Sequence, residues 1–216
     1  MTIGFFLHQT LSFTHAAGVW GDEIYASALA KGCRALGYDA HVYGENLGFF
    51  PPVDLAIYFH LPGPAWDRRG KNNVYFAQNL GHPGGIMGLV KQCQALGPTL
   101  TLSRRAAQET GAVFLPPCVD PDAFHQVPAD PTFACEVCYV GNVLTEREAR
   151  TRAYLNVAPA SLRVYGRSFG RILTQEESLR LYSTAQIGLN FGFEEGVVWD
   201  CVIARPFQLA ACGCFV

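Results

Sequence analysis

The stretch that decides the fold is IGFFL (residues 3–7), followed by DEIYASALAKGCRAL (22–36) and YDAHVY (38–43). The outer two segments are short and apolar, as buried strands are. The middle segment has apolar residues at helical spacing, and Gly37 follows it as a stop signal. We expect its buried face to consist of Ile24, Ala28, Leu29, Cys33 and Leu36. The stretch predicts a strand, a helix and a second, parallel strand.

The same alternation continues to about residue 117. Further predicted strands are DLAIYFH (54–60), NNVYFAQN (72–79), TLTLS (99–103) and AVFLPP (112–117), with helices around 86–96 and 103–110. Strands that alternate with helices favour a parallel sheet covered on both faces. We therefore predict one doubly wound α/β domain over residues 1–120.

A proline-rich segment interrupts this pattern. PPCVDPDAFHQVPADP (116–131) contains five of the thirteen prolines, and we interpret residues 121–131 as a hinge. The alternation then restarts over 132–216, with predicted strands CEVCYV (135–140), SLRVYG (161–166), QIGLNF (186–191) and CGCFV (212–216). Helices are expected from Thr145, from Thr174 and around 202–211, and both TERE (145–148) and TQEE (174–177) are capping-box sequences.

The second domain has fewer predicted strands than the first, and its last one ends at Val216. A parallel sheet that stops there would have an uncovered edge. We therefore expect the second domain to be incomplete and the sequence to be a fragment.

The composition excludes several classes of protein. Sixteen Lys and Arg against eighteen Asp and Glu give a net charge of −2, so a nucleic-acid partner is not expected. No apolar run is long enough to suggest a transmembrane segment. The N-terminus, MTIGFFLHQT, lacks the basic region and cleavage site of a signal peptide, which favours a cytoplasmic protein.

Eight cysteines raise the question of a metal site. Cys135 and Cys138 form a C-x-x-C, and Cys212 and Cys214 form a C-x-C, which together supply four candidate zinc ligands. The first pair lies in a predicted strand, where residues three apart point to opposite faces. We therefore favour small buried core residues over a metal site, and we expect no cofactor.

Two glycine-containing turns precede predicted helices, AAGVWGDE (16–23) and YVGNVLTERE (139–148). In doubly wound folds such turns lie where helix N-termini bind anions. Neither turn matches the G-x-G-x-x-G fingerprint or the phosphate-binding P-loop. Tight turns that need glycine for their backbone conformation remain the alternative.

The second half has a more specific pattern. The segments CEVCYVGNVLTERE (135–148), LRVYGRSFGRILTQEESLRLYSTAQIGLNFG (162–192) and RPFQLAACGCFV (205–216) resemble glycosyltransferases of the GT-B fold, and most closely their CgeB-like spore-maturation group. The linker LPPCVDPDAF (115–124) is similar to the hinge entry of these enzymes. The resemblance implies two Rossmann-like domains, of which the second holds a nucleotide-sugar donor and the first an acceptor.

The resemblance implies a site for each part of the donor. Gly141 and Asn142 are expected at the diphosphate, with Arg147 balancing its charge, and Tyr165 and Gly166 near the nucleoside. Such enzymes need no metal when arginines and a helix dipole stabilise the leaving phosphate. The expected function is therefore metal-independent transfer of a sugar to a hydroxyl acceptor.

The chain departs from the family in the element that contains Arg205. In the family, R-x-F-E has a Glu that binds the ribose hydroxyls, whereas this chain has Gln208 there, eight positions after Asp200. A carboxylate accepts two hydroxyl protons, and an amide offers a single oxygen. Two alternatives stay open: a non-catalytic or degenerate nucleotide-sugar-binding protein, and a two-lobed module that binds sugar or has a regulatory role.

For the catalytic base of the first domain, histidines are the candidates because they titrate near neutrality. His60 ends the predicted strand DLAIYFH, and His82 lies in the loop QNLGHPGG (78–85). Both are expected where strand ends and loops line a cleft, although a structural histidine is the alternative for each. Asp22 and Glu23 are interpreted as residues that favour the start of a helix.

Overall fold

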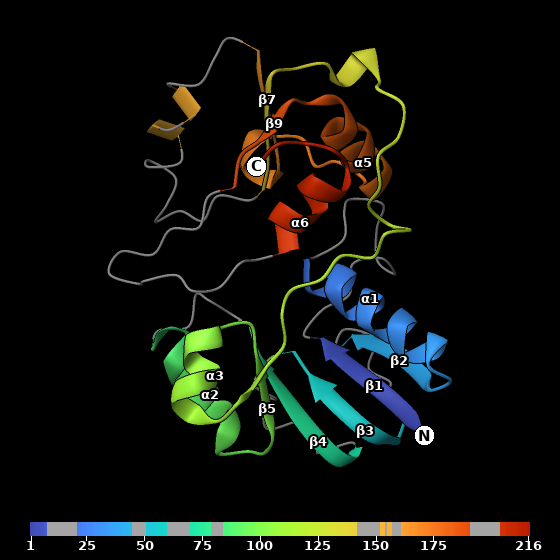
Figure 1. Ribbon diagram of the computed structural model, residues 1–216, viewed down its shortest axis with the longest axis vertical. Coiled ribbons are helices and arrows are strands. Elements are labelled where there is room, and N and C mark those ends of the chain that lie inside the picture. Colours follow the sequence, from blue (N-terminus) through green and yellow to red (C-terminus); the bar gives the residue numbers. More distant parts are fainter. Residues whose placement is uncertain are drawn as a thin grey trace. The chain divides into compact units, whose positions relative to one another are not determined.

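The computed structural model describes residues 1–7, 21–44, 51–59, 70–78, 84–141, 152–153, 155–156, 161–190 and 204–216 (Figure 1). The described residues up to Cys118 form one compact unit, and those from Val119 onward form another. Each unit has its own parallel sheet with helices, so the predicted α/β class with Rossmann-like units is confirmed. None of the described helices is both long and apolar enough to cross a membrane.

The sheet of the first unit has six strands in the order β2-β1-β3-β4-β5-β6, and every pair is parallel. Their bounds are Thr2–Leu7 (β1), Asp39–Gly44 (β2), Val53–Tyr58 (β3), Gly70–Ala77 (β4), Thr99–Thr101 (β5) and Val113–Phe114 (β6). The chain runs outward from β1 to β2 and then returns to the other side of β1 as β3. The sheet order therefore reverses between β1 and β3, which is where doubly wound folds bind ligands.

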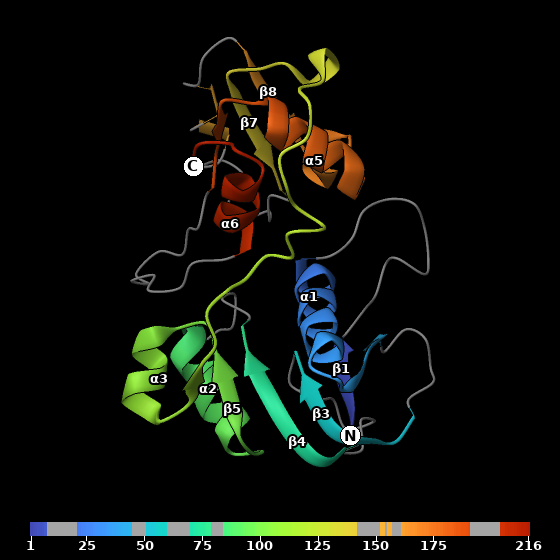
Figure 2. The ribbon, with the colours of Figure 1, turned by 45° about the vertical axis from the view of Figure 1, so that its right-hand side comes forward.

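Three helices cover the two faces of this sheet (Figures 1 and 2). They are α1 (Gly21–Ala35), α2 (Gly85–Gln94) and α3 (Arg104–Thr110). Phe5 and Leu7 pack with residues of α1, whereas Phe6 between them packs with residues of α2 and α3. Successive side chains of a strand point to opposite faces of the sheet, and helices cover both faces. The strands are therefore buried on both sides, which explains their continuous apolar sequence.

The predicted buried face of α1 is wrong in part. Tyr25, Ala26 and Ala30 are the buried apolar residues of this helix, while Leu29 and Cys33 are partly buried. Leu36 is 76% exposed because it lies beyond the end of the helix. Tyr25 stacks on Phe76 with ring centres 5.7 Å apart, and this large aromatic contact decides which of two overlapping apolar stripes faces the sheet.

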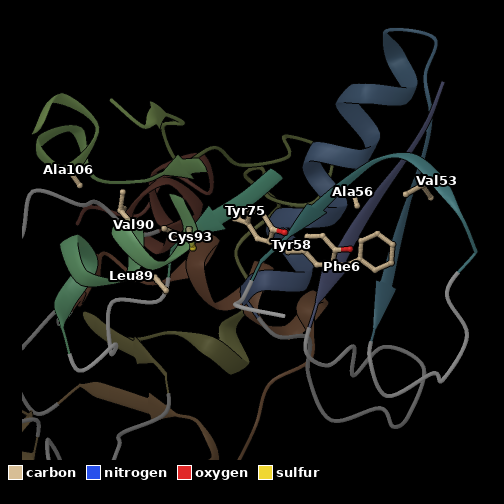
Figure 3. Packing of buried hydrophobic residues seen from close by; sticks show 10 residues of the cluster. Phe6, Val53, Ala56, Tyr58, Tyr75, Leu89, Val90, Cys93 and Ala106 are labelled. Carbon is tan, nitrogen blue, oxygen red and sulfur yellow. The ribbon is translucent and has the colours of Figure 1, made fainter. Parts of the chain in front are cut away.

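A row of stacked rings crosses four strands on the opposite face. Phe6 lies in register with Tyr43 and Tyr58, and Tyr58 lies in register with Tyr75. Successive ring centres are 5.3, 5.2 and 5.4 Å apart, and Figure 3 shows Phe6, Tyr58 and Tyr75 in this row. Each such cross-strand pair contributes about 0.2–1 kcal/mol, so the row helps to hold the strand register.

The second unit has a sheet of three parallel strands in the order β8-β7-β9. Its elements are β7 (Val137–Val140), β8 (Leu162–Tyr165), α5 (Gln175–Thr184), β9 (Ile187–Gly188) and α6 (Ala204–Ala211). The expected strand CGCFV is reduced to one parallel bridge between Phe215 and Ile187. Leu209 of α6 packs directly on Gly188, where a Cβ would lie 2.3 Å from the leucine side chain.

The predicted capping box at the start of α5 is present. The Thr174 hydroxyl accepts a hydrogen bond from the Glu177 amide at 3.1 Å, and the Glu177 carboxylate accepts one from the Thr174 amide at 2.8 Å. Arg171 also donates to Glu177, at 2.8 Å. The second predicted box, TERE, lies outside the described residues.

The capping box makes the stability of the second unit depend on pH. The backbone amide of Thr174, together with Arg171, lowers the pKa of Glu177 below its ordinary value. The stabilisation is therefore complete above the unfolded pKa of about 4.3, and it is lost as the pH falls through the lower, folded pKa.

We expect Glu177→Ala to lower the thermal unfolding midpoint at neutral pH, with a difference from the wild type that narrows below about pH 4. Glu176→Ala is the control, because Glu176 is exposed and its ion pair among the described residues is with Arg180 on the same helix, so the midpoint of this variant should change little. Unfolding followed by circular dichroism across this pH range provides the measurement. A difference that stays constant to low pH would contradict the interpretation.

Candidate functional site

The candidate site lies at the carboxyl edge of the second sheet, where β7 and β9 end. The chain runs from β7 to β8 on one side and later to β9 on the other, so the strand order reverses between β7 and β9. Gly141 directly follows β7, and Asn190 follows β9. Ligands of doubly wound sheets bind in the crevice at such a point, and the side chains there are the first to consider.

Arg205, in the first turn of α6, is the central cation of this site. Its guanidinium carbon lies 5.7 Å from the centre of the Tyr139 ring. One guanidinium nitrogen is 3.5 Å from the Asn190 carboxamide oxygen. The side chain is half-buried, so the ring and the amide oxygen replace part of the water that the charge would otherwise contact.

Arg205 has no carboxylate partner within the part of the chain that the structure describes. Two other arginines of this unit are paired with carboxylates: Arg171 with Glu177 at 2.8 Å, and Arg180 with Glu176 at 2.5 Å. A half-buried charge that no carboxylate balances is costly, and an anionic ligand lowers that cost. Arg205 therefore has the properties of an anion-binding residue.

Gly141 makes room for this arrangement. A Cβ at Gly141 would lie 2.9 Å from the Tyr139 hydroxyl and 3.0 Å from a guanidinium nitrogen of Arg205. The Gly141 amide itself donates to the carbonyl of Tyr165 at 2.9 Å. Gly141 therefore lies next to Arg205, as predicted for one site. It contributes space for the neighbouring side chains and no hydrogen-bond donor, because its amide is already bonded to Tyr165.

Tyr165 and Gly166, predicted near a nucleoside, follow one another at the end of β8. Tyr165 is buried, with the Arg171 guanidinium carbon 5.4 Å from its ring centre and Phe133 packed edge-on at 6.5 Å. Gly166 has φ of 146°, a conformation that side chains rarely allow, and its amide donates to the Arg171 carbonyl at 2.7 Å. Both residues stabilise the turn after β8.

Gln208 lies one turn after Arg205 on α6 and is half-buried. Its carboxamide forms no hydrogen bond with the residues that the structure describes. Its position on the same helix leaves it available for a ligand near Arg205. The remaining predicted site residues lie outside the described residues: His60, His82, Asn142, Arg147 and Asp200.

A second group of polar residues lies at the carboxyl edge of the first sheet. Asp22 and Glu23 occupy the first turn of α1, as predicted. Desolvation raises the pKa of Asp22, and a hydrogen bond with Gln78, at the end of β4, opposes that shift. The adjacent Glu23 is buried. These groups lie near the point where this sheet reverses its order.

Metal ligands do not gather in the described part of the chain: no three of its His, Cys, Asp and Glu side chains are placed to hold one ion. Cys138, Cys212 and Cys214 are all buried in the second unit. The site at Arg205 therefore consists of organic groups, namely a guanidinium, a phenol and a carboxamide.

Sequence reasoning missed Tyr139 and Asn190 as site residues, although both lie within the segments CYVGN and GLN that carried the resemblance. The available signal was their position at a strand end. The chain matches no protein-family profile and no curated protein in comparisons with known sequences. The chemistry of the site is therefore interpreted from its own geometry.

We expect the contact between Arg205 and Tyr139 to contribute about 0.5–1 kcal/mol, the range for partly exposed cation–π pairs. A double-mutant cycle of Arg205→Met and Tyr139→Leu measures this coupling through urea unfolding. The control is a second cycle in which position 139 changes from Phe to Leu, because Phe keeps the ring face and should still couple to Arg205. If the coupling is near zero in both the Tyr-to-Leu cycle and the Phe-to-Leu cycle, the contact is contradicted.

Proposed function

We propose that the chain binds the diphosphate of a nucleotide sugar at Arg205 and belongs to a glycosyltransferase that moves the sugar to a hydroxyl acceptor. The observation that carries this proposal is a half-buried guanidinium that has no carboxylate partner among the described residues and lies at the carboxyl edge of a parallel sheet. An arginine offers two parallel N–H donors that match phosphate oxygens. A diphosphate therefore suits the position better than a neutral sugar.

Arg205 also suits the chemistry of transfer. As the acceptor oxygen attacks the anomeric carbon, the bond to the diphosphate breaks and negative charge develops on the leaving oxygen. A fixed cation at that oxygen stabilises the transition state more than the ground state. Tyr139 and Asn190 hold the guanidinium in place before the substrate arrives. In this proposal the reaction needs no metal ion.

The acceptor hydroxyl must lose a proton in the same reaction. We assign this role to His60 or His82 in the first unit, following the sequence. A neutral imidazole takes the proton as the new glycosidic bond forms. Asp22 and Gln78 lie at the carboxyl edge of the same unit and can hydrogen-bond sugar hydroxyls.

Binding should respond to the charge of residue 205. We expect a nucleoside diphosphate to bind the wild type, and Arg205→Gln to weaken binding about 10- to 100-fold, since a hydrogen bond to a charged group contributes about 1.5–3 kcal/mol. Arg205→Lys should give an intermediate affinity because it keeps the charge and loses the fork. Calorimetric titration with UDP, GDP and ADP in turn provides the measurement.

Arg180→Gln is the matched control, because Arg180 lies in the same unit but already pairs with Glu176 and Asp130. Its affinity for the same nucleotide should equal that of the wild type. If both substitutions weaken binding equally, or if no nucleoside diphosphate binds, the donor site at Arg205 is wrong.

Gln208 favours a second candidate function, in which the protein binds a nucleotide sugar without turnover. An amide accepts fewer ribose hydroxyl protons than the Glu that the resemblance leads one to expect. We expect Gln208→Glu to tighten nucleoside diphosphate binding and to raise the rate of sugar release from a radiolabelled donor. Tighter binding with no release in either form would favour the binding protein over the transferase.

A further inference from the structure

The Tyr139 ring has a further neighbour besides Arg205. Phe169 packs edge-on against it, with ring centres 6.0 Å apart and an angle of 86° between the two planes. The guanidinium carbon of Arg152 lies 5.6 Å from the centre of the Phe169 ring. Two arginines and two rings are therefore joined in one series of contacts, which runs Arg205, Tyr139, Phe169, Arg152. The proposed function makes use of Arg205 and Tyr139 and assigns nothing to the other two.

This series connects parts of the second unit that are far apart in the sequence. Tyr139 lies near the end of β7, and Arg205 lies in the first turn of α6. Phe169 belongs to a short 3-10 helix, η4 (Arg167–Phe169), that follows β8 at the same carboxyl edge. Arg152 lies in the helical segment between β7 and β8. Phe169 thus connects the turn after β8 to the candidate site.

The turn after β8 is closed at both ends, which fixes the backbone of Phe169. At its start the Gly166 amide donates to the Arg171 carbonyl at 2.7 Å, and the Phe169 amide donates to the Gly166 carbonyl at 3.0 Å. At its end Gly170 has φ of 78°, and its amide donates to the Arg167 carbonyl at 3.3 Å. The two glycines thereby hold a tight turn whose one large apolar side chain is that of Phe169.

The Tyr139 ring needs a support outside its own strand. A Cβ at Gly141, the first residue after β7, would lie 2.9 Å from the Tyr139 hydroxyl, so the ring reaches the level of the first residue beyond the strand. Strand pairing fixes the backbone of Tyr139 but not the torsions of its side chain. The edge-to-face contact with Phe169 restricts those torsions, because aromatic pairs favour this geometry. The face of the ring therefore stays in place under the guanidinium of Arg205.

We propose that Phe169 is a positioning residue of the donor site. It holds the Tyr139 ring, and the ring holds the Arg205 guanidinium in the orientation that receives the diphosphate. A binding group that is fixed before the ligand arrives loses less freedom on binding, so the affinity is higher. The effect on nucleotide binding rests on the proposed function. The effect on the contact between Arg205 and Tyr139 does not, because it concerns the protein without ligand.

The first test is calorimetric titration with the nucleoside diphosphate that the wild-type chain binds among UDP, GDP and ADP. We expect Phe169→Leu to weaken binding about three- to tenfold, since leucine keeps the apolar contact and loses the ring edge. At a factor of ten per 1.4 kcal/mol, this loss corresponds to about 0.7–1.4 kcal/mol. Phe169→Tyr keeps the ring and should keep the wild-type affinity within about twofold.

The matched control for this titration is Phe124→Leu. Phe124 is a buried phenylalanine of the same unit, it lies in the proline-rich segment, and it takes no part in the series of contacts described above. Its substitution should lower the unfolding midpoint and leave the affinity unchanged. Equal weakening by Phe124→Leu and Phe169→Leu would mean that any loss of stability lowers the affinity, and the positioning role would be wrong.

A second titration shows whether Phe169 acts through Tyr139. Phe169→Leu is added to Tyr139→Leu, and we expect no further loss of affinity, because the ring through which Phe169 acts is then absent. Losses that add would mean that Phe169 affects the nucleotide by another route, which overturns the proposal.

Urea unfolding tests the positioning without any ligand. The cycle of Arg205→Met and Tyr139→Leu is repeated in chains that carry Phe169→Leu, and we expect the coupling between Arg205 and Tyr139 to fall by roughly half or more. Phe169 is half-buried, so the leucine variant should fold. If it does not, Phe169→Met replaces it, because a methionine side chain is flexible enough to fill the same space. An unchanged coupling would overturn the proposal.

The two proposals fail in different ways. If no nucleoside diphosphate binds the wild type, the donor site is refuted, and the unfolding cycle alone decides whether Phe169 holds Arg205 in place. If Arg205→Gln weakens binding and Phe169→Leu does not, the donor site stands and the positioning role is refuted.

Discussion

Parallel strand pairing is the constraint on which the rest of this structure depends. A parallel strand must be followed by a crossover before its neighbour begins, and the crossovers place helices on the faces of the sheet. Every described pair of strands in both units is parallel. All the carboxyl ends of each sheet therefore lie at one edge, and described polar residues that follow those ends, such as Gln78 and Asn190, lie there.

Burial on both faces follows from the same constraint. β1 contributes Phe5 and Leu7 to the core under α1 and Phe6 to the core under α2 and α3. The aromatic row from Tyr43 to Tyr75 depends on in-register pairing, because a slip of one residue would move each ring to the opposite face. The aromatic row therefore helps to keep the central strands of the first sheet in register.

In the second unit, close packing positions the candidate site. Leu209 seats α6 on Gly188, and α6 then carries Arg205 to the ends of β7 and β9. Gly141 leaves the space that the guanidinium and the Tyr139 hydroxyl occupy. Two glycines therefore determine the position of Arg205. Gly188 allows α6 to pack closely on the sheet, and Gly141 leaves space for the Arg205 side chain.

The sequence by itself determined the α/β class, the strands, most helix bounds and the capping box at Thr174, because these depend on local periodicity and on hydrogen bonds between near neighbours. It also selected Arg205 and Gly141, since they lie in specific motifs. Only the tertiary structure decided which face of α1 is buried, that Tyr139 and Asn190 accompany Arg205, and that the Gly141 amide is already bonded. Each of these depends on residues that lie far apart in the chain, and their proximity is set by strand order and helix packing, which no local pattern records.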